Sequence, residues 1–214
     1  MIRPRFLLLS ASVVTVLAAA LWIGASGVRA DDADFVRWDI INITVPFNAT
    51  PPITTISSGG VAFALADANL KIQFTGSGTF VAPASGHSDD DRRHADGESG
   101  AVTGGGTWET FDGATSTGSG TYQVTRLVSR QFANFASPVT TDLIGPNAAN
   151  GNAILRIQYS DGSEGVLGVG CHGPGAPAGI QEGVIATKGY FTYWTAPAPL
   201  PTVNANRTSF HILR

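Results

Sequence analysis

A thiol and an imidazole are neighbours in the sequence at Cys171 and His172. A cysteine next to a histidine suggests a nucleophile and its base. The strand pattern around them argues against this pair, because adjacent residues on a β-strand point to opposite faces. A catalytic pair would then need His87, His94 or His211 to approach Cys171. We expect instead a small buried thiol, followed by a histidine at the end of a strand.

A polar segment at residues 87–98, HSDDDRRHADGE, carries two histidines and several carboxylates. Its spacing does not fit a calcium-binding EF-hand loop, because the glycine position falls on His94. The separation of His87 and His94 matches no zinc motif, and two arginines interrupt the acidic run. We therefore expect a solvated loop over residues 82–100 and no metal site. A lid over a pocket is the alternative.

The familiar catalytic and cofactor motifs are missing from the sequence. It has no G-x-S-x-G, no H-E-x-x-H, no P-loop and no dinucleotide-binding fingerprint. We predict no catalytic residue and no cofactor, which favours a protein that is not an enzyme. The alternative is a barrel enzyme of the cyclase or hydrolase type that uses His172, Glu182 and Lys188 near strand ends.

Three similar phrases, GSGTF, GGGTW and GSGTY, begin at Gly76, Gly104 and Gly118. In a strand, alternation places two glycines and the following aromatic ring on one face. Glycine pairs let a sheet bend and leave a gap that a neighbouring ring can fill. We expect Trp108 and Tyr122 to point inward beside glycines of adjacent strands.

Residues 106–108, Gly-Thr-Trp, resemble the G-x-W motif of the lipocalins. The resemblance covers three residues in the middle of the chain, whereas the lipocalin motif lies on the first strand. The alternation of glycine and aromatic residues also resembles the small exported barrels of the dirigent and allene oxide cyclase type. Both resemblances imply a β-barrel fold and do not by themselves imply a function.

After residue 30 the sequence shows alternating strand patterns and no helical periodicity. These patterns predict an all-β fold, either a single antiparallel β-barrel (calycin-like or similar) or a β-sandwich of about eight strands. The expected strands are residues 36–45, 60–66, 69–82, 106–111, 120–129, 152–159, 163–171 and 182–194.

One hairpin can be aligned residue by residue from the sequence. A three-residue loop at residues 160–162, with Gly162 in the left-handed conformation, pairs Ile157 with Gly165 and Leu155 with Leu167. This register separates an apolar face from a polar face, whereas a shift by one residue would mix them. The apolar face then carries Leu155, Ile157, Tyr159, Leu167, Val169 and Cys171.

The chain divides into three segments. Residues 1–30 have a basic start, an apolar middle and a small residue at the end, as in a secretory signal peptide. We expect cleavage after Ala30, with an uncleaved membrane anchor through residues 6–24 as the alternative. Residues 31–195 form the β-domain. Residues 196–214 are rich in proline, and we expect an extended C-terminal tail.

Charge and cysteine content restrict the partners of the exported chain. Removing the three arginines of residues 1–30 from 13 basic residues leaves 10 against 16 acidic residues, a net charge of about −6. Such a chain lacks the basic surface that nucleic acids require. Its single cysteine permits no internal disulfide.

We therefore predict a secreted or extracytoplasmic β-barrel that binds a small apolar ligand or a surface partner. A structural protein of the cell envelope is a further alternative. The candidate ligand-binding residues are Trp108, Tyr122, Tyr159 and His172.

Overall fold

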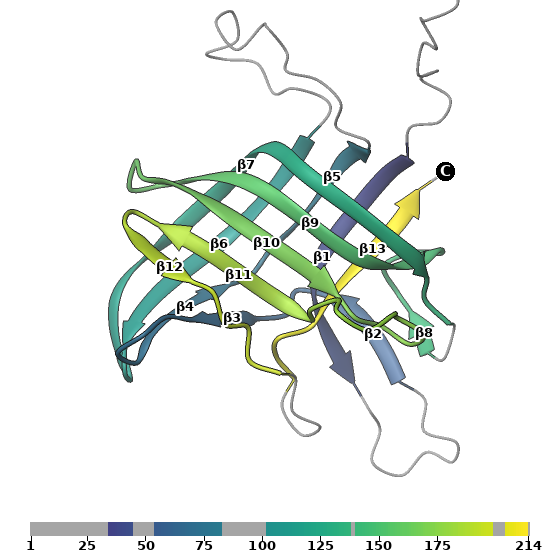
Figure 1. The fold of residues 1–214 in the computed structure, drawn as a ribbon, viewed down its shortest axis with the longest axis horizontal. Coiled ribbons are helices and arrows are strands. Elements are labelled where there is room, and N and C mark those ends of the chain that lie inside the picture. The colour runs from purple at the N-terminus through teal and green to yellow at the C-terminus, as the bar shows by residue number, and fades with distance from the viewer. Residues whose placement is uncertain (1–33, 45–53, 83–101, 138–139, 199–203, 214) are drawn as a thin grey trace, which may run out of the picture. The chain divides into compact units, whose positions relative to one another are not determined.

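The structure, a computed structural model, describes residues 34–44, 54–82, 102–137, 140–198 and 204–213. Within these residues the fold is all-β and contains no helix (Figure 1). The thirteen strands are β1 (Asp34–Thr44), β2 (Thr54–Ser58), β3 (Ala62–Leu65), β4 (Leu70–Phe74), β5 (Ser77–Ala82), β6 (Val102–Asp112), β7 (Thr115–Phe135), β8 (Thr140–Asp142), β9 (Ala148–Tyr159), β10 (Glu164–Cys171), β11 (Gly183–Lys188), β12 (Phe191–Tyr193) and β13 (Thr208–Leu213).

Six strands close into an antiparallel barrel, which confirms the predicted fold class. The strands pair in the order β1-β5-β6-β7-β9-β13, and β13 pairs again with β1 to complete the ring. Closure leaves these strands without a free edge along the paired stretches. The barrel interior is apolar and includes Trp38, Phe80, Leu127 and Phe210.

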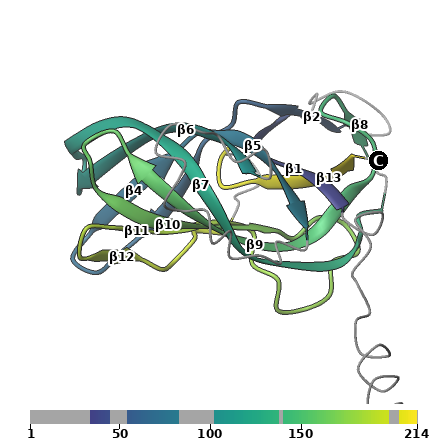
Figure 2. The same ribbon diagram turned by 90° about the horizontal axis from the view of Figure 1, so that it is seen from above.

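The sheet continues beyond the barrel on two sides. Strands β10, β11 and β12 extend from β9, and β4 and β3 extend from β6 (Figures 1 and 2). The two extensions meet where Leu65 exchanges backbone hydrogen bonds with Trp194 and Thr195. We call the region enclosed by these extensions with β6, β7 and β9 the aromatic lobe. Its core contains Phe74, Trp108, Tyr122 and Tyr159.

The predicted hairpin register is confirmed in β9 and β10. Ile157 pairs with Gly165 and Leu155 with Leu167, and Gly162 has a φ of 86°. The apolar side chains of this hairpin are buried in the core. One slip of register would have exposed them, so burial and turn geometry select the same pairing.

The repeated phrases also form strands as expected, with their rings directed inward. Trp108 pairs with Gly120, and Tyr122 pairs with Gly106. A Cβ at Gly76 would lie 2.4 Å from the Tyr122 hydroxyl oxygen, so the ring fills the space that the missing side chain leaves. The phrases therefore shape the sheet.

Strand β7 spans 21 residues and forms walls of both the barrel and the aromatic lobe. Its register against β9 shifts between Val124 and Arg126 and again between Leu127 and Ser129. Such bulges bend a strand and change which side chains face inward. After the first shift Leu127 is buried, while Val128 is 54% exposed.

The structure corrects the boundary expected at residue 195. The expected tail, residues 196–214, contains β13, which pairs with both β1 and β9 inside the barrel. Two expected strands are also divided: residues 69–82 form β4 and β5, and residues 182–194 contain β11 and β12.

Two expectations fall on residues outside those described. These are the signal peptide or anchor at residues 1–30 and most of the acidic loop at residues 82–100. Across residues 34–213, apart from the undescribed stretches, no helix is long and apolar enough to cross a membrane.

Candidate functional site

A pocket of about 400 Å³ opens at the end of the aromatic lobe, between the β6–β7 and β11–β12 hairpins. This volume is within the range of small-molecule sites. Its wall is mainly apolar and aromatic, with hydroxyl groups and two charged side chains at defined places. The lining residues are Leu70, Thr110, Phe111, Asp112, Thr117, Ser163, Lys188, Gly189, Tyr190, Phe191 and Tyr193.

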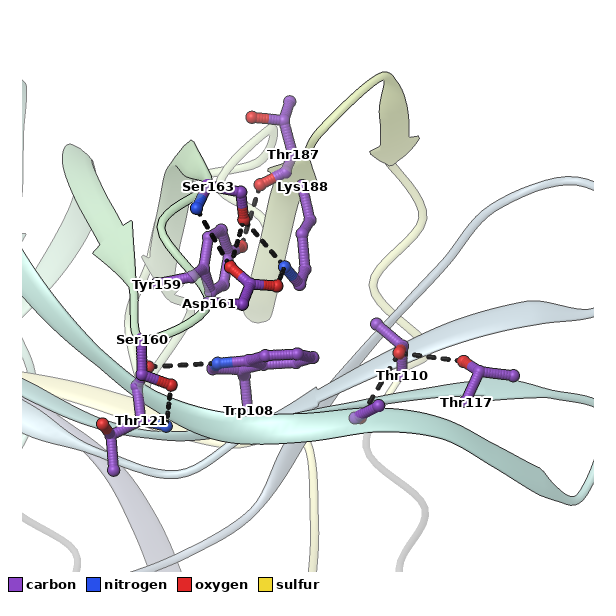
Figure 3. Close-up of polar contacts among 11 residues, drawn as sticks. Trp108, Thr110, Thr117, Thr121, Tyr159, Ser160, Asp161, Ser163, Thr187 and Lys188 are labelled. Carbon is purple, nitrogen blue, oxygen red and sulfur yellow. Dashed lines mark hydrogen bonds and ion pairs between the residues drawn. The ribbon is translucent and has the colours of Figure 1, made fainter.

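Lys188 is the cation at the inner side of this pocket. Its Nζ lies 4.2 Å from the ring centroid of Trp108 and 4.4 Å from that of Tyr159. The same nitrogen forms an ion pair with Asp161 and donates a hydrogen bond of 2.8 Å to Ser163 Oγ (Figure 3). Two aromatic faces and two oxygen acceptors thus compensate the charge of a side chain that is only 13% exposed.

Asp161 comes from the β9–β10 turn, and Lys188 ends β11. The carboxylate accepts hydrogen bonds from both the backbone N–H and the hydroxyl of Ser163. The hydrogen bond from Lys188, then those from Ser163, lower the pKa of Asp161 to about 2. The turn that the sequence predicts therefore also supplies the counterion of the pocket.

Trp108 and Tyr159 hold the lysine through contacts of their own. Their rings pack edge to face with centroids 5.5 Å apart. The Trp108 indole donates to the backbone oxygen of Thr121, and the Tyr159 hydroxyl donates to that of Thr187. Because their polar atoms are satisfied by backbone, the rings form a rigid support.

Hydroxyl groups mark the polar part of the pocket wall. Thr117 donates to Thr110 across the β6–β7 hairpin, and Thr110 donates to the backbone oxygen of Gly118 (Figure 3). Ser163 lies beside Lys188. A lysine ammonium has three donors, and described oxygen atoms accept two of them, from Asp161 and Ser163.

The four residues proposed from the sequence separate into two groups. Trp108 and Tyr159 lie directly beneath Lys188, and Tyr122 packs deeper in the same core, where its hydroxyl donates to the backbone of Thr75. His172 follows the opposite end of β10 from Ser163, roughly 30 Å away at the rise of a strand. The structure does not bring His172 to the pocket.

The structure also keeps Cys171 and His172 apart. Cys171 is buried, and burial raises the pKa of its thiol to about 12. His172 is exposed, and its Nδ1 lies 2.8 Å from the backbone oxygen of Ile180. Their opposite orientation follows from strand alternation, so His172 does not serve as a base for the Cys171 thiol.

A serine, a histidine and an aspartate also meet on the outer side of β13. His211 Nε2 lies 2.8 Å from Asp142 Oδ2, and Ser209 precedes His211 by two residues. Neither the Ser209 hydroxyl nor His211 Nδ1 has a hydrogen-bond partner among the described residues, and both atoms are buried. Since these two atoms do not bond each other, the cluster lacks the nucleophile–base contact of a catalytic triad.

The sequence contained a signal for the pocket that alternation alone did not reveal. Residues 190–194, YFTYW, hold four aromatic residues in five positions. Tyr190 is 90% exposed at the tip of the β11–β12 hairpin, and its ring lies 4.4 Å from that of Phe191. Aromatic rings at an exposed hairpin tip often mark a contact surface.

Fold and pocket together define a closed antiparallel β-barrel with a ligand-sized aromatic pocket beside it. Comparison with protein-family models, curated proteins and solved structures finds no match for this chain. The function must therefore be argued from the geometry alone.

Proposed function

We propose that this chain is a non-enzymatic binding protein that holds a small, mainly apolar molecule in the pocket of the aromatic lobe. The observation that carries the proposal is the pocket of about 400 Å³ with one compensated lysine at its inner side. Ligand sites combine an apolar wall with a few polar groups that fix orientation. Leu70, Phe111 and Tyr193 supply the wall, while Lys188 and Ser163 supply the polar end.

The charge of the pocket favours a neutral ligand. Asp161 already neutralises Lys188, and Asp112 adds a carboxylate to the lining. An anionic ligand would meet this second carboxylate, and a cation would meet the ammonium. The polar end instead suits a carbonyl, ether or hydroxyl oxygen on an otherwise apolar body.

A catalytic role for Lys188 and Ser163 is less well supported. A lysine that activates a serine must accept the serine proton, so it must be neutral. Here Lys188 Nζ donates a hydrogen bond to Ser163 Oγ and contacts the Asp161 carboxylate, which is the reverse of accepting the serine proton. The contacts therefore fit a binding group better than a general base.

An extracytoplasmic location belongs to the same proposal and rests on the pattern of residues 1–30. The expected mature N-terminus is Asp31. N-terminal sequencing of the exported chain tests this expectation, and a start at Met1 in the membrane fraction would support the anchor alternative.

Binding is tested with N-phenyl-1-naphthylamine, a neutral apolar fluorophore, titrated against the full chain. We expect saturable fluorescence enhancement that Thr117→Trp weakens by about tenfold, because the larger ring occupies the pocket. Thr115→Trp is the matched control, since Thr115 is exposed on the same strand and does not line the pocket.

The pair of variants separates pocket binding from adsorption of the probe to the surface. Equal affinity of both tryptophan variants, or no saturation with the unmodified chain, would contradict the proposal. Substituting Ser163→Ala tests the polar end, and we expect a loss of a few-fold for a probe that carries a carbonyl group.

A further inference from the structure

Another cavity, of about 210 Å³, lies on the outer face of the sheet where β9 runs between β7 and β10. Its volume is below the range of sites that enclose a whole drug-sized molecule, so it fits one polar group of a ligand whose remainder stays in solvent. The cavity can be reached from solvent, because Arg156 and Glu164 in its wall are exposed. The lining residues are Thr125, Arg126, Arg156, Ile157, Gln158 and Glu164.

Two arginines are direct cross-strand partners at this cavity. The first bulge of β7 brings Arg126 into register with Arg156 of β9, while Leu127 pairs with Leu155 on the opposite, buried face. Thr125 lies within the bulge, and its hydroxyl donates a hydrogen bond of 3.3 Å to the backbone oxygen of Arg156. Bulges redirect side chains and are frequent beside functional sites. Here the bulge places two positive charges side by side.

The described residues do not compensate this pair of charges. Directly opposed side chains on neighbouring strands have Cβ atoms about 5 Å apart, so like charges there repel. Glu164, the carboxylate in the lining, is opposite Gln158 and therefore only diagonal to Arg156. Neither arginine forms an ion pair with Glu164 or with another described carboxylate. An anion from solvent would relieve the repulsion.

We propose that Arg126 and Arg156 form a surface site for a singly charged tetrahedral oxyanion, the sulfate group of a sulfate monoester. A carboxylate has two oxygens, which match the fork of one guanidinium. A sulfate group has three terminal oxygens that point in different directions, so it can accept hydrogen bonds from two guanidinium groups together. The Gln158 amide adds a neutral donor beside the pair.

The charge of the cavity favours a sulfate ester over a phosphate ester. Two arginines and one glutamate give the lining two positive charges and one negative charge, a net charge of +1. A sulfate monoester carries one negative charge, whereas a phosphate monoester carries about 1.5 to 2 near pH 7. Glu164 would repel this additional charge.

This site shares no residue with the lining of the aromatic pocket and does not depend on the function proposed there. The two proposals can therefore fail separately.

NMR titration of the full chain tests the site by following the Nε–H resonances of Arg126 and Arg156. The probes are glucose 6-sulfate, glucose 6-phosphate and glucose, which differ only in the group on one oxygen. We expect saturable shifts with glucose 6-sulfate, weaker binding of glucose 6-phosphate and no shifts with glucose. Arg126→Gln and Arg156→Gln should each weaken sulfate binding by about tenfold, because each removes charge-assisted hydrogen bonds.

Arg207→Gln is the matched control, since Arg207 is a partly exposed arginine outside the cavity lining. It lowers the net charge of the chain equally and should keep the full affinity. Without ligand, Arg156→Gln should not lower the melting temperature, because it removes a repulsive pair. Glu164→Gln should raise the affinity for glucose 6-phosphate more than for glucose 6-sulfate.

Three results would overturn the proposal. The first is a response to glucose 6-sulfate no larger than the response to glucose. The second is an Arg207→Gln variant that loses as much affinity as the Arg126 and Arg156 variants, since binding would then depend on overall charge. The third is tighter binding of glucose 6-phosphate than of glucose 6-sulfate to the unmodified chain.

Discussion

Lys188 and Arg130 are both largely buried cations held against two aromatic rings, but their polar surroundings differ. Lys188 has a carboxylate, a hydroxyl group and the faces of Trp108 and Tyr159. Arg130 has the rings of Phe80 and Phe210 and no hydrogen-bond acceptor among the described residues. One lies at the wall of a pocket, and the other lies inside the closed barrel.

The difference shows that this fold contains one largely buried cation with polar partners and one without them in the described part of the chain. Lys188 has its counterion, Asp161, supplied by a neighbouring turn, so its charge is compensated within the folded structure. A buried cation without an acceptor lowers the stability of the fold, because its donors have lost water without gaining hydrogen bonds. The comparison therefore separates a cation that is compensated beside the pocket from a cation in the barrel that has no acceptor among the described residues.

The largest expected effect comes from removing the support beneath Lys188. Trp108→Ala should lower the free energy of unfolding by about 3–5 kcal/mol, because it removes a buried ring and leaves a cavity. Urea denaturation measures the change. Trp194→Ala is the control, because Trp194 is 61% exposed and its loss should cost less than about 1 kcal/mol. Similar losses for the two variants would show that Trp108 does not support the lobe.

The partly buried carboxyl group of Glu182 extends the comparison to an acidic side chain. Glu182 accepts backbone N–H bonds from His172 and Thr208, but burial outweighs them and raises its pKa to about 7. The folded protein then binds this proton more tightly than the unfolded chain does. Stability should be highest below pH 4.5 and should fall by up to about 3 kcal/mol as the pH rises through 7.

Urea unfolding at a series of pH values measures this contribution, and Glu182→Gln is the control. The glutamine variant should lack the decline between pH 4.5 and 7, after other titrating groups are accounted for by subtraction. A decline of the same size in the variant would show that Glu182 is not its source.

Matching methionine substitutions test the central contrast directly. Lys188→Met should destabilise the fold by about 1–2 kcal/mol, because it removes the ion pair and two cation–π contacts. Arg130→Met should raise stability by about 1–2 kcal/mol in chloride buffer, because it removes an unpaired buried charge. Urea denaturation of both variants measures whether the free energy of unfolding falls or rises. Destabilisation of equal size in both variants would contradict the distinction between a compensated Lys188 and an uncompensated Arg130.

The smallest effect concerns the counterion of Lys188. The pKa of Asp161 is lowered to about 2, so its contribution to stability is present above the ordinary aspartate value of 3.8 and is lost as the pH falls through 2. Because 44% of the side chain is exposed, solvent screens the pair, and the loss should be below about 1 kcal/mol. Carboxyl NMR titration measures the pKa directly. A Lys188→Met background should return it toward 3.8.

The part of the fold that local pattern governs could be predicted from the sequence. The β9–β10 register follows from the turn at Asp161 and Gly162 and from the need to keep Leu155 and Leu167 on one face. The inward position of Trp108 follows from the glycines around it. Both depend on neighbours in the chain or on a single pairing, and alternation is sufficient for each.

In strand β7, the local alternation of residues is not sufficient to predict which side chains face inward. Simple alternation from Tyr122 and Val124 would place Val128 inside and Leu127 outside, but the bulges reverse this order. The positions of the bulges depend on how β7 bends between the lobe and the barrel. That bend is a property of sheet closure, which no short stretch of sequence encodes.

By itself, then, the sequence determined that the chain after residue 30 is all-β, that residues 152–159 and 163–171 form a hairpin, and that Cys171 and His172 point apart. Only the tertiary structure decided that β13 closes the barrel, that Lys188 meets Asp161 and Trp108, and that the terminal nitrogens of Arg130 have no hydrogen-bond partner in the described part of the chain. The physical reason is that burial and charge compensation depend on strands far apart in the chain. These quantities become defined only when the sheet closes.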